Sequence, residues 1–181
     1  MGKMARWIVD PDHSVAAFSV VHMMIARVRG QFNKISGTIY YDPLNINTSS
    51  VELAINVASI FTGIQKRDDH LRSADFFDVE KYPAILFKST HIESTTGKLV
   101  KVTGDFQMHG RTSLITIPAR LSGPVKDPLG DGLSMGFTAS LALNREDYAM
   151  IWNQPMADNG FMVGSEVEIL VDIEADLDSS E

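Results

Sequence analysis

The sequence predicts an all-β fold of antiparallel strands, a sandwich or a closed barrel, with one short helical segment. Apolar and polar residues alternate in segment after segment along most of the chain. Turn-forming residues separate these segments, as short connections between antiparallel strands require. A helical period replaces the alternation only between Ala58 and Pro83. This pattern gives about eight or nine strands and one helical segment, which is typical of a sheet folded or closed on itself.

The composition indicates one globular domain and excludes several functional classes. The chain has 181 residues, 44% hydrophobic and 22% charged, enough to bury roughly 70% of its unfolded surface. A net charge of −7 argues against a nucleic-acid partner. The absence of cysteine excludes disulfides and thiolate metal sites. No stretch approaches the roughly 18 apolar residues of a membrane span, so an integral membrane protein is not expected.

The start of the chain bears on localisation. Residues 1–7 contain no apolar core of a secretory signal. The sequence as given therefore favours the cytoplasm, with the periplasm as the alternative if a leader has been removed.

The N-terminal half contains four segments with the strand period. Phe18 and Val20 share one face of the second segment, and the third is read as one long strand that Gly30 and Gly37 bend or bulge. The predicted strands are residues 6–9, 14–22, 27–41 and 51–58.

The segment before Pro83 is expected to be helical. Thr62 and Gln65 have the spacing of a capping box, with Thr62 as the N-cap. Ile64 and Leu71 then lie on one helical face, and Arg67 falls on the same stripe at spacings of three and four residues. An inward arginine needs a carboxylate, a backbone carbonyl or an anionic ligand.

The C-terminal half contains five segments with the strand period, at residues 84–92, 98–108, 112–122, 133–144 and 167–177. Thr96 and Gly97 form a plausible hairpin turn, and Gly123-Pro124 marks the end of a strand. The last segment is the clearest, because alternate residues are apolar and most of the others are acidic, with Leu170 as the exception. It predicts a half-buried strand whose acidic face meets water.

The sequence shows no catalytic or metal-binding signature. It has no Gly-x-Ser-x-Gly elbow, no glycine-rich phosphate loop and no acid pair that stands out. The five histidines are His13, His22, His70, His91 and His109. No two of them have the close spacing of metal ligands, so no metal is expected. His22 shares the inward phase of Phe18 and Val20. It therefore either bonds a neighbouring group or meets a ligand head group at a barrel mouth.

Four groups of residues carry a family resemblance. They are Asp12-His13-Ser14 with Phe18, His22, Gly30, Phe32 and Gly37; Arg67 to Asp78 with Tyr82-Pro83 and Phe87-Lys88-Ser89; Val102 to Phe106 with Gly110 and Thr112; and Asn144 to Tyr148 with Val163-Gly164. With these residues the chain resembles the YceI-like family, whose members look like lipocalins and include polyisoprenoid-binding proteins.

The resemblance implies an extended eight-stranded antiparallel barrel with a short helical insert, as a single domain over residues 5–178. Its apolar tunnel would take an isoprenoid chain, such as a quinone tail or a polyprenyl phosphate, with no further cofactor required. Members are linked to lipid transport, storage or stress response and have no settled enzymatic activity. Barrels of this kind are often dimeric, so we expect a homodimer.

Three hypotheses follow. In the first, the barrel binds an amphipathic isoprenoid lipid, with His22, Arg67 and His70 at its polar head. In the second, it is a small lipid isomerase or hydrolase using His22 or His70. In the third, it is a filled barrel that only offers a partner surface. The first hypothesis predicts a tunnel lined by Phe18, Val20, Phe32, Ile55, Phe87, Phe106, Met108, Phe137 and Trp152.

Overall fold

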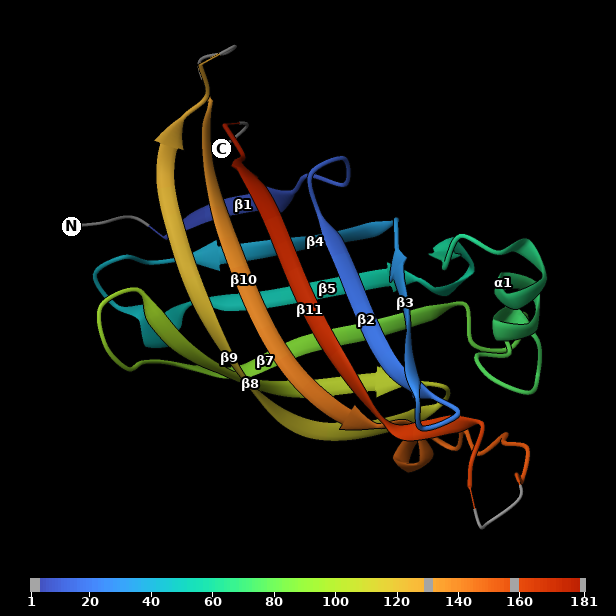
Figure 1. The fold of residues 1–181 in the computed structure, drawn as a ribbon. Helices are drawn as coiled ribbons and strands as arrows, with labels where there is room; N and C mark the ends of the chain where they lie inside the picture. The colour runs from blue at the N-terminus through green and yellow to red at the C-terminus, as the bar shows by residue number, and fades with distance from the viewer. Residues whose placement is uncertain (1–3, 129–131, 157–159, 180–181) are drawn as a thin grey trace.

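The computed structural model describes residues 4–128, 132–156 and 160–179, and they form a long antiparallel barrel with a short helix at one end (Figure 1). The strands are β1 Ala5–Val9, β2 Val15–His22, β3 Ala26–Phe32, β4 Ile35–Tyr41, β5 Ser50–Asn56, β6 Ile60–Phe61, β7 Ala84–Ser94, β8 Leu99–Met108, β9 Arg111–Lys126, β10 Leu133–Asn144 and β11 Val163–Leu177. The helix α1 is Gln65–Arg72, and short 3-10 turns are η1 Ile46–Thr48, η2 Val57–Ser59 and η3 Arg145–Tyr148.

Within the described residues, eight strands close the barrel in the order β1-β4-β5-β7-β8-β9-β10-β11. The ring closes where β1 pairs with the end of β11, with Trp7 opposite Leu177. Strands β2, β3 and β6 continue the sheet from β11 toward the end of the barrel that carries α1. The predicted eight-stranded antiparallel barrel with a short helical insert is therefore confirmed.

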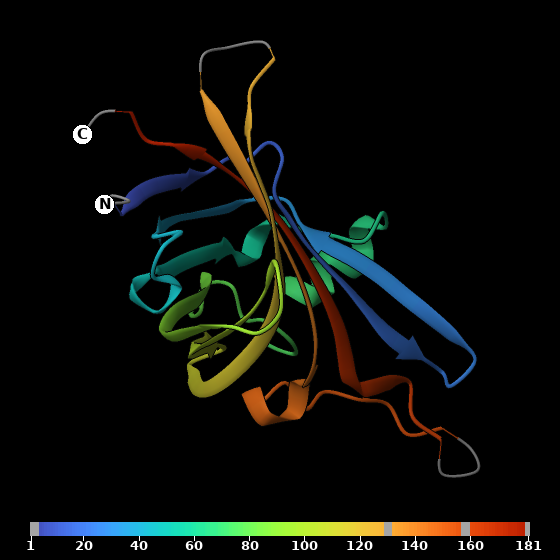
Figure 2. The same cartoon turned by 90° about the vertical axis from the view of Figure 1, so that its left-hand side faces the viewer.

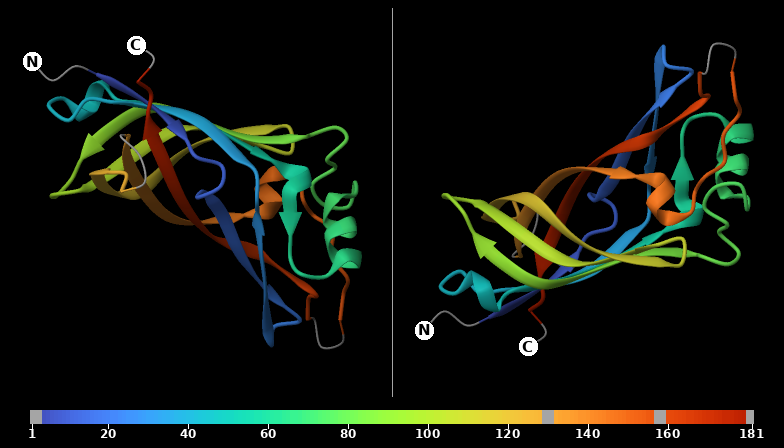
Figure 3. Two further views of the ribbon diagram at one scale, coloured as in Figure 1. Left: turned by 90° about the horizontal axis from the view of Figure 1, so that it is seen from above. Right: turned by 90° about the horizontal axis from the view of Figure 1, so that it is seen from below.

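The long strand β11 explains how the barrel changes shape along its length. Its last residues pair with β1, whereas the segment from Val163 to Asp172 pairs with β2. Strand β4 pairs with β1, and β3 pairs with β2. The two pairs belong to different parts of β11, so the sheet divides toward the α1 end. Figures 2 and 3 show the β2–β3 hairpin diverging from the rest of the barrel at that end.

This split corrects the prediction of one long strand over residues 27–41. The chain is interrupted at Asn33 and Lys34, whose backbone N–H groups both donate to Ser59 Oγ at 3.1 Å. The two glycines permit close packing and lie inside regular strands. A Cβ on Gly30 would lie 2.5 Å from the Phe18 ring, and one on Gly37 would collide with the Glu52 carbonyl.

Two local predictions are also wrong. Strand β9 continues through Gly123-Pro124 as far as Lys126, because β10 continues to pair with it there. Helix α1 has no capping box: its N-cap is Ile64, which supplies no side-chain bond. The Thr62 hydroxyl instead donates to the Asp68 carboxylate at 2.5 Å.

The last strand confirms its predicted faces. Val167, Ile169, Val171 and Ile173 turn into the barrel, and Leu170 is 45% exposed on the outside with the acids. Packed side chains fill the barrel around β1, where Trp7, Val9, Met135 and Ala175 are buried. No helix among the described residues has both the length and the apolar character needed to cross a bilayer.

Candidate ligand-binding site

The barrel encloses a cavity of about 220 Å³. Its wall is formed by inward-facing side chains from β2 round to β11, together with Leu71 of α1 and the following Phe76 and Phe77. All of the predicted tunnel residues except Trp152 lie in this wall: Phe18, Val20, Phe32, Ile55, Phe87, Phe106, Met108 and Phe137. They face inward because alternate residues of a strand share one face. Their contact with a ligand stays a prediction.

The cavity surface is apolar almost without exception. Among the described residues, Arg145 is the one charged residue in the wall, and only the aliphatic part of its side chain meets the cavity. The guanidinium turns away and donates to the backbone carbonyls of Met150, Val163 and Gly164. A ligand inside the cavity can therefore present only hydrocarbon, because a polar group there would find no hydrogen-bond partner.

Arg145 is 4% exposed, and its sequence position predicted no role for it in the site beyond the family resemblance of residues 144–148. Its Nε donates to the Gly164 carbonyl at 2.9 Å and its Nη2 to the Val163 carbonyl at 3.3 Å. Burial lowers the pKa of Arg145 below its ordinary value. The signal was present in the sequence, since Arg145 continues the inward phase of Leu141 and Leu143 on β10.

Three rings form a cover over the cavity at the α1 end, and we call His70, Phe76 and Trp152 the aromatic cover. The Trp152 ring lies 4.8 Å from His70 and 5.1 Å from Phe76, centroid to centroid, and the His70 and Phe76 rings are 5.1 Å apart. Phe76 itself lines the cavity, whereas Trp152 does not. Trp152 thus connects the segment after η3 to the α1 segment from outside the wall.

The predicted head-group residues lie on the elements at this end, and no hydrogen bond or ring contact of the described residues joins them to one another. His70 Nε2 lies 2.8 Å from the Asp75 carboxylate, and His22 is half-buried where β2 ends. Arg67 donates to the hydroxyl and the carbonyl of Thr62, at 2.7 and 2.8 Å. Arg67 was expected to meet a carboxylate, a backbone carbonyl or an anionic ligand. The structure shows the backbone carbonyl, together with the neutral hydroxyl of the same Thr62.

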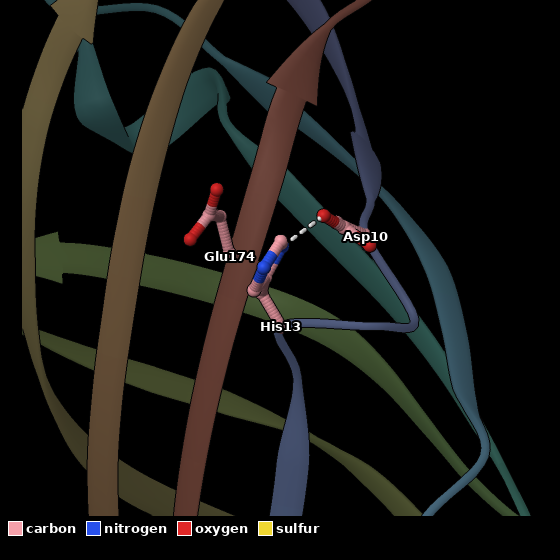
Figure 4. Close-up of side chains that lie close together, drawn as sticks. All are labelled: Asp10, His13 and Glu174. Carbon is pink, nitrogen blue, oxygen red and sulfur yellow. Dashed lines mark hydrogen bonds and ion pairs between the residues drawn. The ribbon is translucent and has the colours of Figure 1, made fainter. Parts of the chain in front are cut away.

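A second cluster lies on the outside of the barrel, where β1 gives way to β2 (Figure 4). Asp10, His13 and Glu174 place one ligand atom each within 4.8 Å of the others, and His13 Nδ1 is 2.6 Å from the Asp10 carboxylate. The same residues hold the β1–β2 connection on β11. The Asp10 N–H donates to the Glu174 carbonyl at 2.9 Å, and the Glu174 N–H donates to Ser14 Oγ at 3.1 Å. A metal-free protein stays a prediction.

The Asp10–His13 pair should make stability depend on pH. Its hydrogen bond lowers the pKa of Asp10 and raises that of His13. The Asp10 contribution is present above about pH 4 and is lost as the pH falls through its lowered pKa; the His13 contribution is present below about pH 6.5 and is lost as the pH rises through its raised pKa. The His13→Asn variant should therefore lower Tm more at about pH 5.5 than at about pH 8.5.

A double-mutant cycle isolates this pair. In the Asp10→Asn background the effect of His13→Asn on Tm should differ much less between the two pH values, because the hydrogen bond to Asp10 is the main cause of the raised pKa of His13, and the charges of Glu174 and Asp12 add less. Calorimetry of the four proteins measures the difference. If the pH dependence of the His13→Asn effect is undiminished without Asp10, another group causes it and the assignment is wrong.

Comparison with known proteins agrees with this geometry. The model of the YceI-like domain matches residues 7–175. A UPF0312 protein of Pseudomonas savastanoi is 36% identical over 148 residues, which are 81% of this chain and 77% of the relative.

Two solved structures share the fold. BcnA of Burkholderia cenocepacia is 24% identical and superposes with a TM-score of 0.80 over 92% of this chain and 98% of its own. A polyisoprenoid-binding domain from Saccharophagus degradans, implicated in plant cell wall breakdown, is 15% identical, with a TM-score of 0.69 over 97% of this chain and 100% of that domain. The family model covers nearly the whole barrel, and the chain belongs to the YceI-like family.

Proposed function

We propose that the chain binds a polyisoprenoid or a similar amphipathic lipid, with the hydrocarbon tail inside the barrel and the polar head outside. The observation that carries this proposal is the cavity wall, which presents hydrocarbon in all directions. Burial of apolar surface at roughly 25 cal/mol per Å² would provide most of the affinity. The Saccharophagus degradans domain, named for polyisoprenoid binding, supports the proposal through its shared fold.

The size of the cavity limits how the lipid enters. At about 220 Å³ it exceeds the engineered apolar cavity of roughly 150 Å³ that binds benzene in another protein, but it lies below the roughly 300 Å³ of typical ligand pockets. A long tail therefore needs Phe76 and Phe77 to turn aside at the α1 end. We propose that the chain carries or stores the lipid and that loading displaces the aromatic cover.

The head group would then lie outside the aromatic cover. His70 is the first candidate, because its ring contacts Phe76, which lines the cavity. His22 and Arg67 are the further candidates at the same end. Imidazole and guanidinium N–H groups can donate to a quinone carbonyl or to a phosphate.

The cavity argues against the other hypotheses. A filled barrel would not enclose this volume. An enzyme acting on the tail would need an acid or base facing it, and no titratable atom of the described residues is exposed in the cavity wall. The absence of enzymatic activity, and the homodimer, stay predictions.

Extraction and titration test the function. We expect organic extraction of the purified protein, followed by mass spectrometry, to release a long-chain isoprenoid lipid. The delipidated protein should bind a prenyl alcohol and the prenyl phosphate of equal chain length with similar affinity, because the tail dominates both complexes. Tryptophan fluorescence in a Trp7→Phe background, where Trp152 is the remaining tryptophan, measures the binding.

A head-group variant sharpens the test. His70→Ala should lower the affinity for the prenyl phosphate about tenfold, which corresponds to the loss of one charge-assisted hydrogen bond. The affinity for the prenyl alcohol should stay unchanged. A delipidated protein that binds neither ligand would refute the proposed function. An unchanged preference between the two ligands would remove only His70 from the head-group site.

A further inference from the structure

The β2–β3 hairpin has the opposite charge to the rest of the protein. The chain carries 23 acidic and 16 basic residues, yet residues 15–32 contain no aspartate or glutamate. They contain Arg27 and Arg29, both exposed on β3. The hairpin is therefore locally positive within an acidic protein, and it extends from the barrel at the α1 end (Figures 1 and 3).

The turn at its tip has an unfavourable sequence for its conformation. Met23 and Met24 both adopt positive φ, at 50° and 59°, and the Ile25 N–H closes the turn by donating to the His22 carbonyl at 3.2 Å. Positive φ at both central residues of a β-turn favours Asn-Gly, and Ile25 is an additional loop residue because His22 pairs with Ala26. Met24 is 53% exposed, and the following Ile25 is 83% exposed. The backbone strain opposes folding and the exposed side chains contribute almost nothing to stability, so these residues are better explained by a contact outside the chain.

A third apolar side chain joins the tip. The Met23 N–H donates to the Met162 carbonyl at 2.8 Å, which brings the neighbouring segment against the hairpin, and the adjacent Phe161 is 39% exposed. We call Met24, Ile25 and Phe161 the tip patch. It lies close to the cavity wall, because Val163, two residues after Phe161, lines the cavity and pairs with His22. Val20, also in the wall, is four residues from Met24, or about 13 Å along a strand.

We propose that the tip patch docks the barrel on a lipid bilayer that contains anionic phospholipid. Apolar side chains of peripheral proteins enter the boundary between head groups and acyl chains by roughly 5–10 Å. Arg27 follows Ile25 by two residues and Arg29 by four, which places them about 7 and 13 Å behind the tip, at the depth of the phosphates. Arg27 already pairs with Glu168 of β11 at 2.9 Å. We therefore assign the main phosphate contact to Arg29.

The tip patch lies at the end of the barrel through which a lipid tail would enter, so docking would bring the bilayer close to the cavity. A lipid tail that leaves the bilayer at the tip would enter the barrel near Val20 and Val163, which line the cavity. The docking surface itself does not depend on which ligand fills the barrel. Its failure and the failure of the proposed function are therefore separate results.

Co-sedimentation of the full chain with vesicles tests the proposal. Binding to phosphatidylcholine vesicles should increase when phosphatidylglycerol is included and decrease in high salt. Ile25→Ser should reduce partitioning roughly tenfold or more on both vesicle types, because the variant lacks the isoleucine side chain that would be buried in the bilayer. Arg29→Gln should reduce it about fivefold on the phosphatidylglycerol vesicles only.

A turn variant separates membrane binding from stability. Met23→Asn with Met24→Gly supplies the residues that the turn favours, so Tm should rise while vesicle binding falls. The matched control is Leu44→Ser, because Leu44 is 75% exposed in the connection between β4 and β5, at the opposite end of the barrel in Figure 1. It should leave vesicle binding unchanged. All of these variants should still bind the prenyl alcohol in solution.

Three results would overturn the proposal. The first is a wild-type chain that does not sediment with either vesicle type. The second is an equal loss of binding in Leu44→Ser and Ile25→Ser. The third is an Ile25→Ser variant that binds vesicles normally but changes from dimer to monomer in light scattering, which would assign the tip patch to a second copy of the chain.

Discussion

The Val20→Phe variant is expected to lose about a hundredfold in affinity for the lipid while keeping its folding stability. Val20 lies in the cavity wall, and phenylalanine adds about four carbon atoms that would occupy space otherwise taken by the tail. At about 0.8 kcal/mol per displaced methylene the loss is about 3 kcal/mol. The larger ring enters existing space, so the strain of an overpacked core should be small. Ile55→Phe, also in the wall, should behave in the same way.

Titration with the prenyl alcohol and urea denaturation measure the two quantities separately. The matched control is Leu170→Phe, which makes a similar change on the outside of β11, where Leu170 is 45% exposed. It should alter neither quantity. If Val20→Phe reduces affinity and stability equally, the wall is a packed core and the binding hypothesis loses its basis.

The Arg145→Met variant should lower the free energy of unfolding by about 3 kcal/mol or more. The guanidinium donates to three backbone carbonyls, and methionine removes this donor from all three. The hydrogen bonds to Met150 and Gly164 are buried, whereas the Val163 carbonyl keeps the Asn153 side-chain amide at 2.7 Å, so the loss comes mainly from the first two. Two of the acceptors, Val163 and Gly164, begin β11, and Met150 follows η3. The loss should therefore also loosen the chain around the aromatic cover and weaken lipid binding.

Urea denaturation measures the effect, with Arg120→Met as the control. Arg120 is exposed on β9, and its replacement should change the free energy of unfolding by less than about 0.5 kcal/mol. Arg145→Lys should fall between the two, because one ammonium group cannot reach carbonyls that the planar guanidinium bridges. An Arg145→Met protein as stable as the control would show that water or a rearranged backbone satisfies these carbonyls.

The amino-acid sequence by itself determined the class of the fold and the direction in which its strands face. In a strand the side chains alternate between two faces, so the apolar phase of residues such as Phe18, Ile55 and Phe137 already indicated the inside of a barrel. The same phase includes Arg145, the residue that follows β10 and begins η3, which would have been found by following the alternation past Leu143. This alternation depends only on neighbouring residues of the same strand, so it can be recognised in the sequence of each strand separately.

Only the tertiary structure decided what depends on contacts between distant segments. The break at Asn33 exists because β2 and β1 share β11, and the sequence of residues 27–41 does not contain that information. Trp152 contacts Phe76 and His70 from outside the wall, whereas its chemistry alone suggested a place inside. The hydrogen-bond acceptors of Arg145 and the neighbour of Met23 come from other segments of the chain. A buried polar group takes whichever partner the completed fold places within reach, and spacing along the chain cannot specify that partner.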